Sequence, residues 1–111
     1  MDFIVSKNND IAIITTKVEK LNTSNSSSLK AELVLLGKEN FNKIVIDMSF
    51  TKYCDSSGLS AILIANRMCK DNGGQFYLCG LMPNVQKLIE IAQLDRVLKI
   101  SPNQEDALAK I

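Results

Sequence analysis

Residues 44–48 (IVIDM), near the middle of the chain, form a short and almost unbroken apolar run. A strand with one face in water alternates apolar and polar residues, and this run shows little alternation. It therefore predicts a strand that is covered on both faces, in the middle of a sheet. A helix is expected to follow at about residues 57–71, and its first turns are apolar almost all round, which is typical of a largely buried helix.

Short strands and helices alternate along the rest of the chain. Two β-branched segments around a turn at residues 8–10 predict a hairpin of strands at residues 3–7 and 11–16. Further patterns predict strands at residues 75–80 and 97–100 and a helix at residues 26–36. Another helix is predicted to begin at Pro83, with an inner face formed by Val85, Leu88, Ile89 and Ala92. A capping box with Ser101 as N-cap, Pro102 and Gln104 predicts a last helix that runs through Lys110. The order ββαβαβαβα implies an α/β fold with a mixed, largely parallel sheet of about five strands and about four helices.

The charge of the chain limits the partners that it is expected to bind. Its 13 basic and 12 acidic residues give a net charge of +1 and are spread along the sequence. Nucleic acids and anionic membranes need a concentrated basic face, so neither is an expected partner. No apolar stretch approaches the ~20 residues that cross a bilayer. Because the N-terminus also lacks a signal-peptide pattern, we expect the protein in the cytoplasm.

Histidine is absent from the sequence, which excludes a Ser-His-Asp triad and His-based metal sites. The three cysteines, Cys54, Cys69 and Cys79, lack the spacing of a zinc or redox motif. We expect them to be reduced thiols that serve as small apolar packing groups. For Cys54 there is an alternative that we favour less than packing, namely a thiol whose pKa is lowered by its place in a loop before a helix. No metal and no cofactor are expected.

The loop after the central strand delivers Asp55, Ser56 and Ser57 to the start of the next helix. In open parallel sheets, sites lie at the carboxyl ends of strands, where this loop begins. An N-cap, whose oxygen accepts a bond from a free N–H group of the first turn, explains one of these three residues.

Two further features of this segment point beyond capping. Gly58 costs roughly 1 kcal/mol relative to alanine in a first helical turn, and its lack of a side chain permits close approach by another surface. A serine at a helix start also suits a phosphate, because free N–H groups and the helix dipole favour negative charge. From the residues alone, a capped helix start and an anion site both remain open.

Residues 44–63 (IVIDMSFTKYCDSSGLSAIL) resemble the signature of the STAS domain family, and most of all that of bacterial anti-sigma factor antagonists. In that family an aromatic-x-Asp-Ser-Ser-Gly-Leu segment follows a hydrophobic strand, and residues 53–59 match it. The resemblance covers nearly the whole chain, since the segments at residues 80–85 and 94–97 are also similar to family segments. It implies a single STAS domain at residues 1–111.

The resemblance implies a phosphorylation switch centred on Ser57. In the family the second serine of the segment is the phosphoacceptor, and the unphosphorylated protein binds an anti-sigma factor that is also a serine kinase, which frees the sigma factor. Phosphorylation ends this binding, and a phosphatase resets the cycle. The chain would then be a non-catalytic switch with Ser57 as its phosphorylation site and a partner surface formed by Asn22, Asp55, Ser56, Ser57, Gly58 and Leu59.

Two positions depart from the family pattern. Asn22 stands where an aspartate is usual, on a loop expected near the partner surface, and this leaves the details of the partner interface open. Gln93 stands where a glycine commonly ends a helix, and we expect this difference to be structural.

Three alternatives to the antagonist remain. A STAS domain also serves as a docking module of lipid-transport or signalling complexes, without phosphorylation, although the retained second serine favours the antagonist. A two-component receiver shares the alternating architecture but needs an acidic pair after its first strand, and the hairpin here ends in Thr15, Thr16 and Lys17. An enzyme with Ser56 or Ser57 as nucleophile would have no histidine and no lysine placed as its base.

Overall fold

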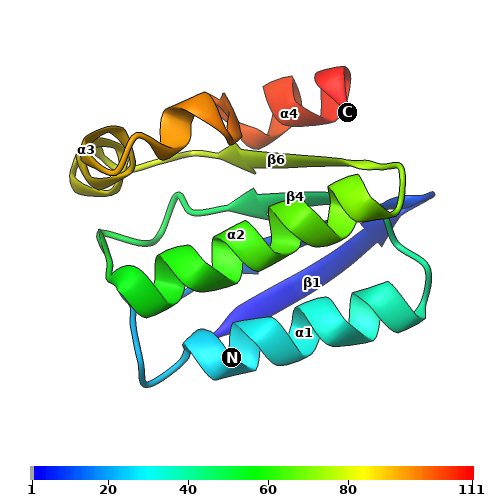
Figure 1. Cartoon of the computed structure of the whole chain (residues 1–111), viewed down its shortest axis with the longest axis horizontal. Coiled ribbons are helices and arrows are strands. Elements are labelled where there is room, and N and C mark those ends of the chain that lie inside the picture. Colours follow the sequence, from blue (N-terminus) through cyan, green and yellow to red (C-terminus); the bar gives the residue numbers. More distant parts are fainter. Residues whose placement is uncertain (1) are drawn as a thin grey trace.

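A five-stranded sheet organises the computed structural model, which describes residues 2–111 (Figure 1). The strands lie in the order β1-β2-β4-β6-β7, and neighbours are parallel except for β1 and β2. Their bounds are Phe3–Asn8 for β1, Ile11–Thr16 for β2, Lys43–Asp47 for β4, Gln75–Cys79 for β6 and Lys99–Ser101 for β7. The mixed, largely parallel sheet predicted from the sequence is confirmed.

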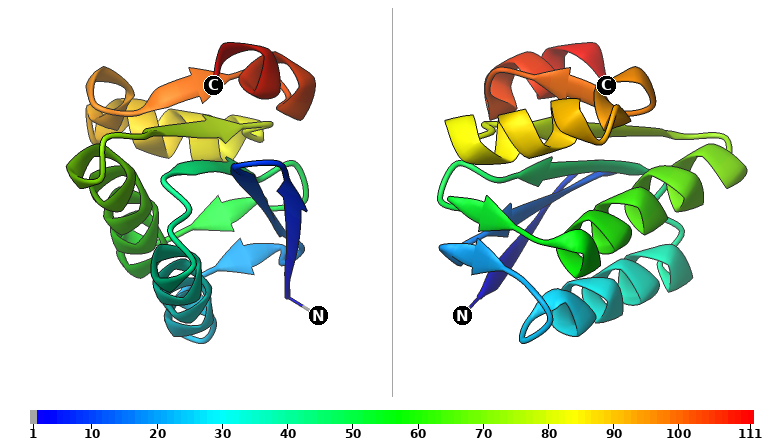
Figure 2. Two further views of the ribbon diagram at one scale, coloured as in Figure 1. Left: turned by 90° about the vertical axis from the view of Figure 1, so that its right-hand side faces the viewer. Right: turned by 60° about the vertical axis from the view of Figure 1, so that its left-hand side comes forward.

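Among the described residues, four α-helices cover the two faces of this sheet. They are α1 (Ser26–Lys38), α2 (Ser56–Asp71), α3 (Pro83–Ile91) and α4 (Gln104–Lys110), and a short 3-10 helix, η1 (Leu94–Arg96), follows α3. Helices α1 and α2 lie side by side on one face, while α4 covers the opposite face (Figure 2). Helices α1, α2 and α3 each connect one parallel strand to the next strand along the sheet, always toward β7. Because such crossovers are right-handed, the three helices lie on the same face.

Strand β4 lies in the centre of the sheet, between β2 and β6. Its residues Ile44, Val45 and Ile46 are fully buried, which confirms the strand covered on both faces. Ile44 and Ile46 belong to the main core beneath α1 and α2, whereas Val45 packs with Ile13 and Ala107 beneath α4. Burial of each such side chain contributes about 1.5–3 kcal/mol, so the apolar run anchors both layers of the fold.

A second, two-stranded sheet was not predicted from the sequence. Strands β3 (Lys20–Leu21) and β5 (Tyr53–Cys54) pair in parallel, as the light-blue and green arrows of Figure 2 show. Neither segment shows a strand signal in the sequence, because a two-residue strand carries no periodic apolar pattern. The pairing ties the segment before α1 to the segment before α2, and so fixes where both helices begin.

Helix α2 is less buried than its sequence suggests. It begins at Ser56, one residue earlier than predicted. Ala61 and Ile62 face the core and are fully buried, but Ile64 is 42% exposed and Leu63 is only half-buried. The prediction of a largely buried helix is therefore wrong for one side of α2, which faces solvent. An apolar surface remains on that side.

Two helix boundaries also differ from prediction. Ser101 ends β7 and is buried, so it does not cap α4. The N-cap is Asn103, whose Oδ1 accepts a hydrogen bond from the N–H group of Asp106 at 2.8 Å. Helix α1 continues through Gly37 to Lys38, two residues further than expected.

Helix α3 ends at Ile91, and the chain then turns through Gln93. Ala92, predicted on the inner face, is exposed because the helix has already ended, whereas Val85 and Ile89 are buried as predicted. Gln93 adopts the left-handed conformation, with a φ of 59° and a ψ of 25°. This conformation costs a residue with a Cβ atom roughly 1–2 kcal/mol, which is why glycine suits the position.

Replacing Gln93 with glycine is expected to stabilise the fold, because glycine adopts this φ without strain. We expect Gln93→Gly to raise the free energy of unfolding in urea by about 1 kcal/mol. The variant Gln93→Ala keeps the Cβ atom and serves as the matched control, with no gain expected. Equal free energies of unfolding for the two variants would show that backbone strain at Gln93 does not limit stability.

Candidate functional site

The first turn of α2 lies at the carboxyl edge of the sheet and is capped by Asp55. Asp55 stands between β5 and α2 with an extended backbone, at φ −96° and ψ −173°. Its Oδ1 atom accepts hydrogen bonds from the N–H groups of Ser57 at 2.9 Å and Gly58 at 3.0 Å. Of the three residues that the sequence offered as caps, Asp55 is the one that caps the helix.

The hydroxyl of Ser57 donates a third hydrogen bond to the same oxygen of Asp55, at 2.6 Å. Ser57 is half-buried, whereas Ser56 is exposed. The bond from the Ser57 hydroxyl, followed by the bond from the Gly58 N–H group, holds the pKa of Asp55 below its ordinary value. A carboxylate, a serine hydroxyl and the N–H groups of a helix start thus converge at one point, and the anion that occupies these N–H groups is the carboxylate of Asp55 itself.

Asn22 lies beside this helix start, although 33 positions separate it from Asp55 in the sequence. The β3–β5 pairing brings the two together, because the N–H group of Asp55 donates to the carbonyl of Leu21 at 3.1 Å. Asn22 and Asp55 line one surface hollow of about 370 Å³, whose other lining residues are Lys20, Leu21, Tyr53 and Cys54. The side chain of Asn22 accepts a hydrogen bond from the N–H group of Ser24 at 2.9 Å, which orders its own loop.

Gly58 is explained by packing inside the molecule. It is buried, and an added Cβ atom would lie 2.6 Å from Sγ of Cys54 and 2.9 Å from the carbonyl oxygen of Leu21. Real Cβ atoms do not approach other atoms this closely, so a side chain at this position would push β3 and β5 away from α2. The close approach that the sequence suggested is thus made by the protein's own strands.

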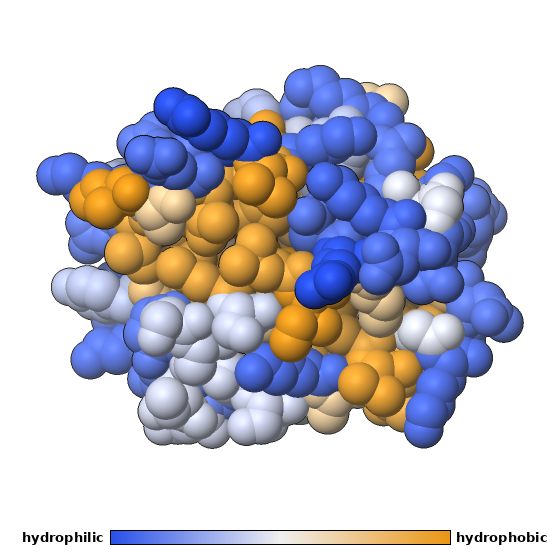
Figure 3. Space-filling model, in the orientation of Figure 1, coloured by the Kyte–Doolittle hydropathy of each residue, from blue (hydrophilic) through white to orange (hydrophobic). Residues whose placement is uncertain are grey.

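Leu59 faces a groove along the outer side of α2. The groove is lined by Ser56, Leu59, Ser60, Leu63, Ile64, Arg67 and Leu94. Figure 3 shows a broad apolar area on this face, between α2 and the segment that holds η1. The groove begins at Ser56 and therefore borders the Ser57 turn directly.

The three cysteines are free and buried, as the sequence predicts. Burial raises the pKa of Cys54 and of Cys79 to about 12, and that of Cys69 to about 11. The possibility of a lowered pKa for Cys54 is therefore wrong. Its thiol packs beneath the first turn of α2 instead of facing solvent.

Two buried threonines support the loop that leads to the site. Oγ1 of Thr51 lies 2.7 Å from Oγ1 of Thr16 and donates to the carbonyl of Val18 at 2.7 Å. The N–H groups of Lys52 and Tyr53 both donate to the carbonyl of Glu19, at 2.8 and 3.1 Å. Residues 17–20 and 50–53 therefore run side by side. Sequence reasoning missed this support, because nothing in the sequence pairs two threonines that are 35 positions apart.

Within residues 2–111, no group of three or more His, Cys, Asp or Glu side chains is placed to hold a metal ion. None of the helices in the same range is long and apolar enough to cross a membrane.

A family model described as the STAS domain matches residues 2–107 of the chain. Among proteins of known description, the chain is similar to BtrV of Bordetella bronchiseptica, a candidate anti-sigma factor antagonist. The two are 27% identical over 89 residues, which cover 80% of this chain and 77% of BtrV.

Solved structures share the fold. A candidate anti-sigma factor antagonist from Thermotoga maritima superposes with a TM-score of 0.90 at 24% identity, covering 98% of this chain and 93% of that one. The anti-sigma factor antagonist SpoIIAA in its unphosphorylated form gives a TM-score of 0.83 at 17% identity, covering 97% and 94% of the two chains. Bacillus SpoIIAA in its phosphorylated form gives 0.76 at 16% identity, covering 97% of each chain.

Adding one methyl group at Gly58 is expected to destabilise the fold. Because that group would meet Cys54 and the Leu21 carbonyl, we expect Gly58→Ala to lower the free energy of unfolding in urea by about 1–3 kcal/mol. Ser60→Ala, on the exposed side of the same helix, is the control and is expected to stay within about 0.5 kcal/mol of the wild type. A loss no larger than that of the control would show that Gly58 has room for a side chain.

The lowered pKa of Asp55 predicts a dependence of stability on pH. Because the folded-state pKa lies below the ordinary value, ionised Asp55 stabilises the fold above that value, and this contribution is lost as the pH falls through the folded-state pKa. Asp55→Asn keeps a capping oxygen but does not titrate. We therefore expect unfolding in urea to show a larger loss of stability between about pH 5 and pH 2 for the wild type than for the variant. Parallel profiles would contradict this prediction.

Proposed function

This chain belongs to the STAS domain family, and we propose that it is an anti-sigma factor antagonist switched by phosphorylation of Ser57. In its unphosphorylated form it binds an anti-sigma factor that is also a serine kinase, and this frees the sigma factor. The kinase transfers the terminal phosphoryl group of ATP to Oγ of Ser57, which ends the binding, and a phosphatase restores the hydroxyl.

The observation that carries the proposal is the hydrogen bond from the Ser57 hydroxyl to Asp55 at the start of α2. Two relatives support it as well. BtrV is named as a candidate antagonist, and SpoIIAA, which shares the fold, is an antagonist with both an unphosphorylated and a phosphorylated structure. Asn22, Ser56 and Leu59, which border the Asp55–Ser57 turn through the hollow and the groove, are proposed to contact the partner together with it.

Phosphorylation would change this turn in three ways. It removes the O–H group that donates to Asp55, and it adds a charge of about −1.5 to −2 at pH 7. The added charge lies next to a carboxylate oxygen that is now only 2.6 Å from Oγ, so the two anions repel each other. Both anions also compete for the N–H groups of Ser57 and Gly58, which the helix dipole makes favourable for negative charge. A partner that fits the neutral hydroxyl would therefore meet a different surface.

Ser57 suits the role better than Ser56. Its hydroxyl is held by Asp55, so it has a defined position and its charge state acts directly on the cap of α2. Catalysis by the same serine is not proposed. A carboxylate whose pKa is held below its ordinary value is a weak base, and the sequence has no histidine to take its place.

The phosphorylation site can be tested directly. The chain is incubated with ATP and the anti-sigma factor kinase proposed above, isolated through its binding to the unphosphorylated chain, and the modified residue is mapped by mass spectrometry. We expect phosphate on Ser57, none on Ser57→Ala, and phosphate still mapped to Ser57 in the matched control Ser56→Ala. If a kinase shown to be active leaves Ser57 unmodified, the switch is wrong, and a docking module without phosphorylation becomes the better description.

The effect of charge on binding is tested with the same kinase by calorimetry. Ser57→Ala is expected to bind as the wild type does, and Ser57→Asp about tenfold more weakly or worse, because like charges at an interface are costly. Ser56→Asp adds the same charge one residue away and is expected to bind more tightly than Ser57→Asp. Equal affinities of Ser57→Ala and Ser57→Asp would show that charge at Ser57 is not the switch.

A further inference from the structure

Two aromatic side chains at the carboxyl edge of the sheet remain open to solvent. Phe50 and Tyr53 are each 52% exposed, and each lies beside a lysine. Nζ of Lys17 is 4.5 Å from the centre of the Phe50 ring, and Nζ of Lys20 is 5.8 Å from that of Tyr53. Since residues 17–20 run beside residues 50–53, these four residues form one surface, here called the basic aromatic strip.

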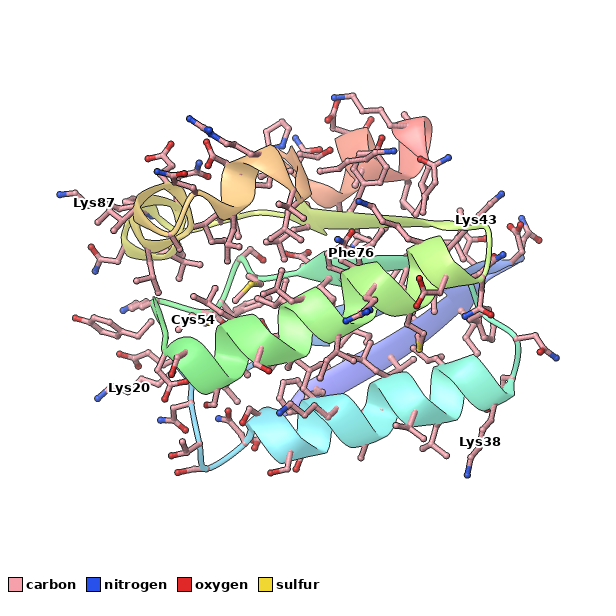
Figure 4. The ribbon with its side chains drawn as sticks, viewed as in Figure 1. Lys20, Lys38, Lys43, Cys54, Phe76 and Lys87 are labelled. Atoms are coloured by element: carbon pink, nitrogen blue, oxygen red, sulfur yellow. The ribbon has the colours of Figure 1, made fainter. Side chains whose placement is uncertain are left out.

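The strip borders the Ser57 turn. Lys20 and Tyr53 line the same hollow as Asp55, and Asp55 holds the hydroxyl of Ser57. Figure 4 shows Lys20 close to Cys54, at the end of the molecule where α2 begins, while Lys38 lies at the opposite end. A protein that brings ATP to Ser57 must cover the surface around this turn, and that surface includes the strip.

The lysines of the strip lack acidic partners within residues 2–111. The ion pairs in this range use Lys7, Lys43, Arg67 and Lys110. Exposed Lys52 lies within the same two segments, and Glu19 is their single acidic residue, so the charge of the strip is positive. Aromatic side chains are enriched at protein interfaces, and a positive surface complements the carboxylates of a partner.

Similar lysine–aromatic pairs elsewhere in the molecule are already satisfied. Lys7 lies 5.6 Å from the centre of the Phe41 ring but also pairs with Glu39. Lys99 lies 5.5 Å from that of Tyr77 but donates a hydrogen bond to Gln75 at 3.2 Å. A lysine over a ring is therefore common in this fold, and the absence of an acidic or polar side-chain partner distinguishes the two pairs of the strip among the described residues.

We propose that the basic aromatic strip docks an acidic segment of the serine kinase that phosphorylates Ser57. The inference rests on the function proposed above and adds a surface to it. Carboxylates of the kinase face Lys17 and Lys20, while apolar side chains of the same segment lie against Phe50 and Tyr53. The lysines steer the kinase toward the Ser57 turn, and the rings contribute contact area once it has arrived.

A charge reversal separates docking from phosphoryl transfer. The double variant Lys17→Glu, Lys20→Glu is compared with the control Lys38→Glu, Lys99→Glu, which changes the net charge equally at sites away from the strip. The rate of Ser57 phosphorylation by the kinase identified above is measured against substrate concentration, at low and at high salt. We expect the strip variant to raise KM about tenfold at low salt with kcat unchanged. We also expect KM to depend on salt for the wild type and not for the variant.

Each outcome of this experiment is decisive. If the wild type is phosphorylated on Ser57 but the strip variant and the control share one KM, the docking proposal is wrong and the proposed function stands. If kcat falls while KM is unchanged, the lysines act in the transfer step, which also overturns docking. If an active kinase does not phosphorylate the wild type, both proposals fail. Urea unfolding of each variant confirms that it folds, and Lys17→Gln, Lys20→Gln repeats the test without added negative charge, with a smaller rise in KM expected.

Discussion

One carboxylate oxygen, Oδ1 of Asp55, accepts three hydrogen bonds at the start of α2, from the N–H groups of Ser57 and Gly58 and from the hydroxyl of Ser57. The first two bonds are an ordinary helix cap. The third ties the hydroxyl that is proposed as the phosphoacceptor to the same oxygen. Phosphorylation of Ser57 would therefore act on Asp55, and so on the cap of α2, at the same point where it changes the surface.

The cap keeps its position because strands far apart in the sequence hold it. The pairing of β3 with β5 places the carbonyl of Leu21 where it accepts a bond from Asp55, and Gly58 lets the helix rest directly on Leu21 and Cys54. The buried hydroxyl of Thr51, bonded to the carbonyl of Val18, holds the preceding loop against the end of β2. The turn that bears Ser57 therefore rests on contacts between distant segments as well as on its own cap.

Local patterns in the sequence were enough for the five-stranded sheet and for the capped start of α2. The unbroken run at residues 44–48 predicted the central strand, and an Asp-Ser-Ser-Gly segment after it predicted a capped helix start. What failed depends on tertiary contacts. Strands β3 and β5 are too short to show a periodic pattern. Gly58 lacks a side chain because it packs against Leu21, 37 positions upstream, which a local pattern does not reveal. The exposed side of α2 depends on how far the neighbouring elements extend over it. Ser101 matched a capping box, but strand pairing with Cys79 took it into the sheet.

Two surfaces of different chemistry meet at the Ser57 turn. Ser56 lines the apolar groove along α2, and Asp55 lines the hollow that Lys20 and Tyr53 share. A partner that covers the turn therefore touches both. Under the proposed function, burial of the groove would add affinity without depending on charge, while the lysines would act at longer range and favour acidic partners. A phosphate at the junction would add negative charge beside both surfaces. Covering that charge with the apolar groove would cost desolvation energy, and the lysines would pair with the phosphate in place of a partner's carboxylates. A single modification can thus weaken both parts of the interface, although it touches neither part directly.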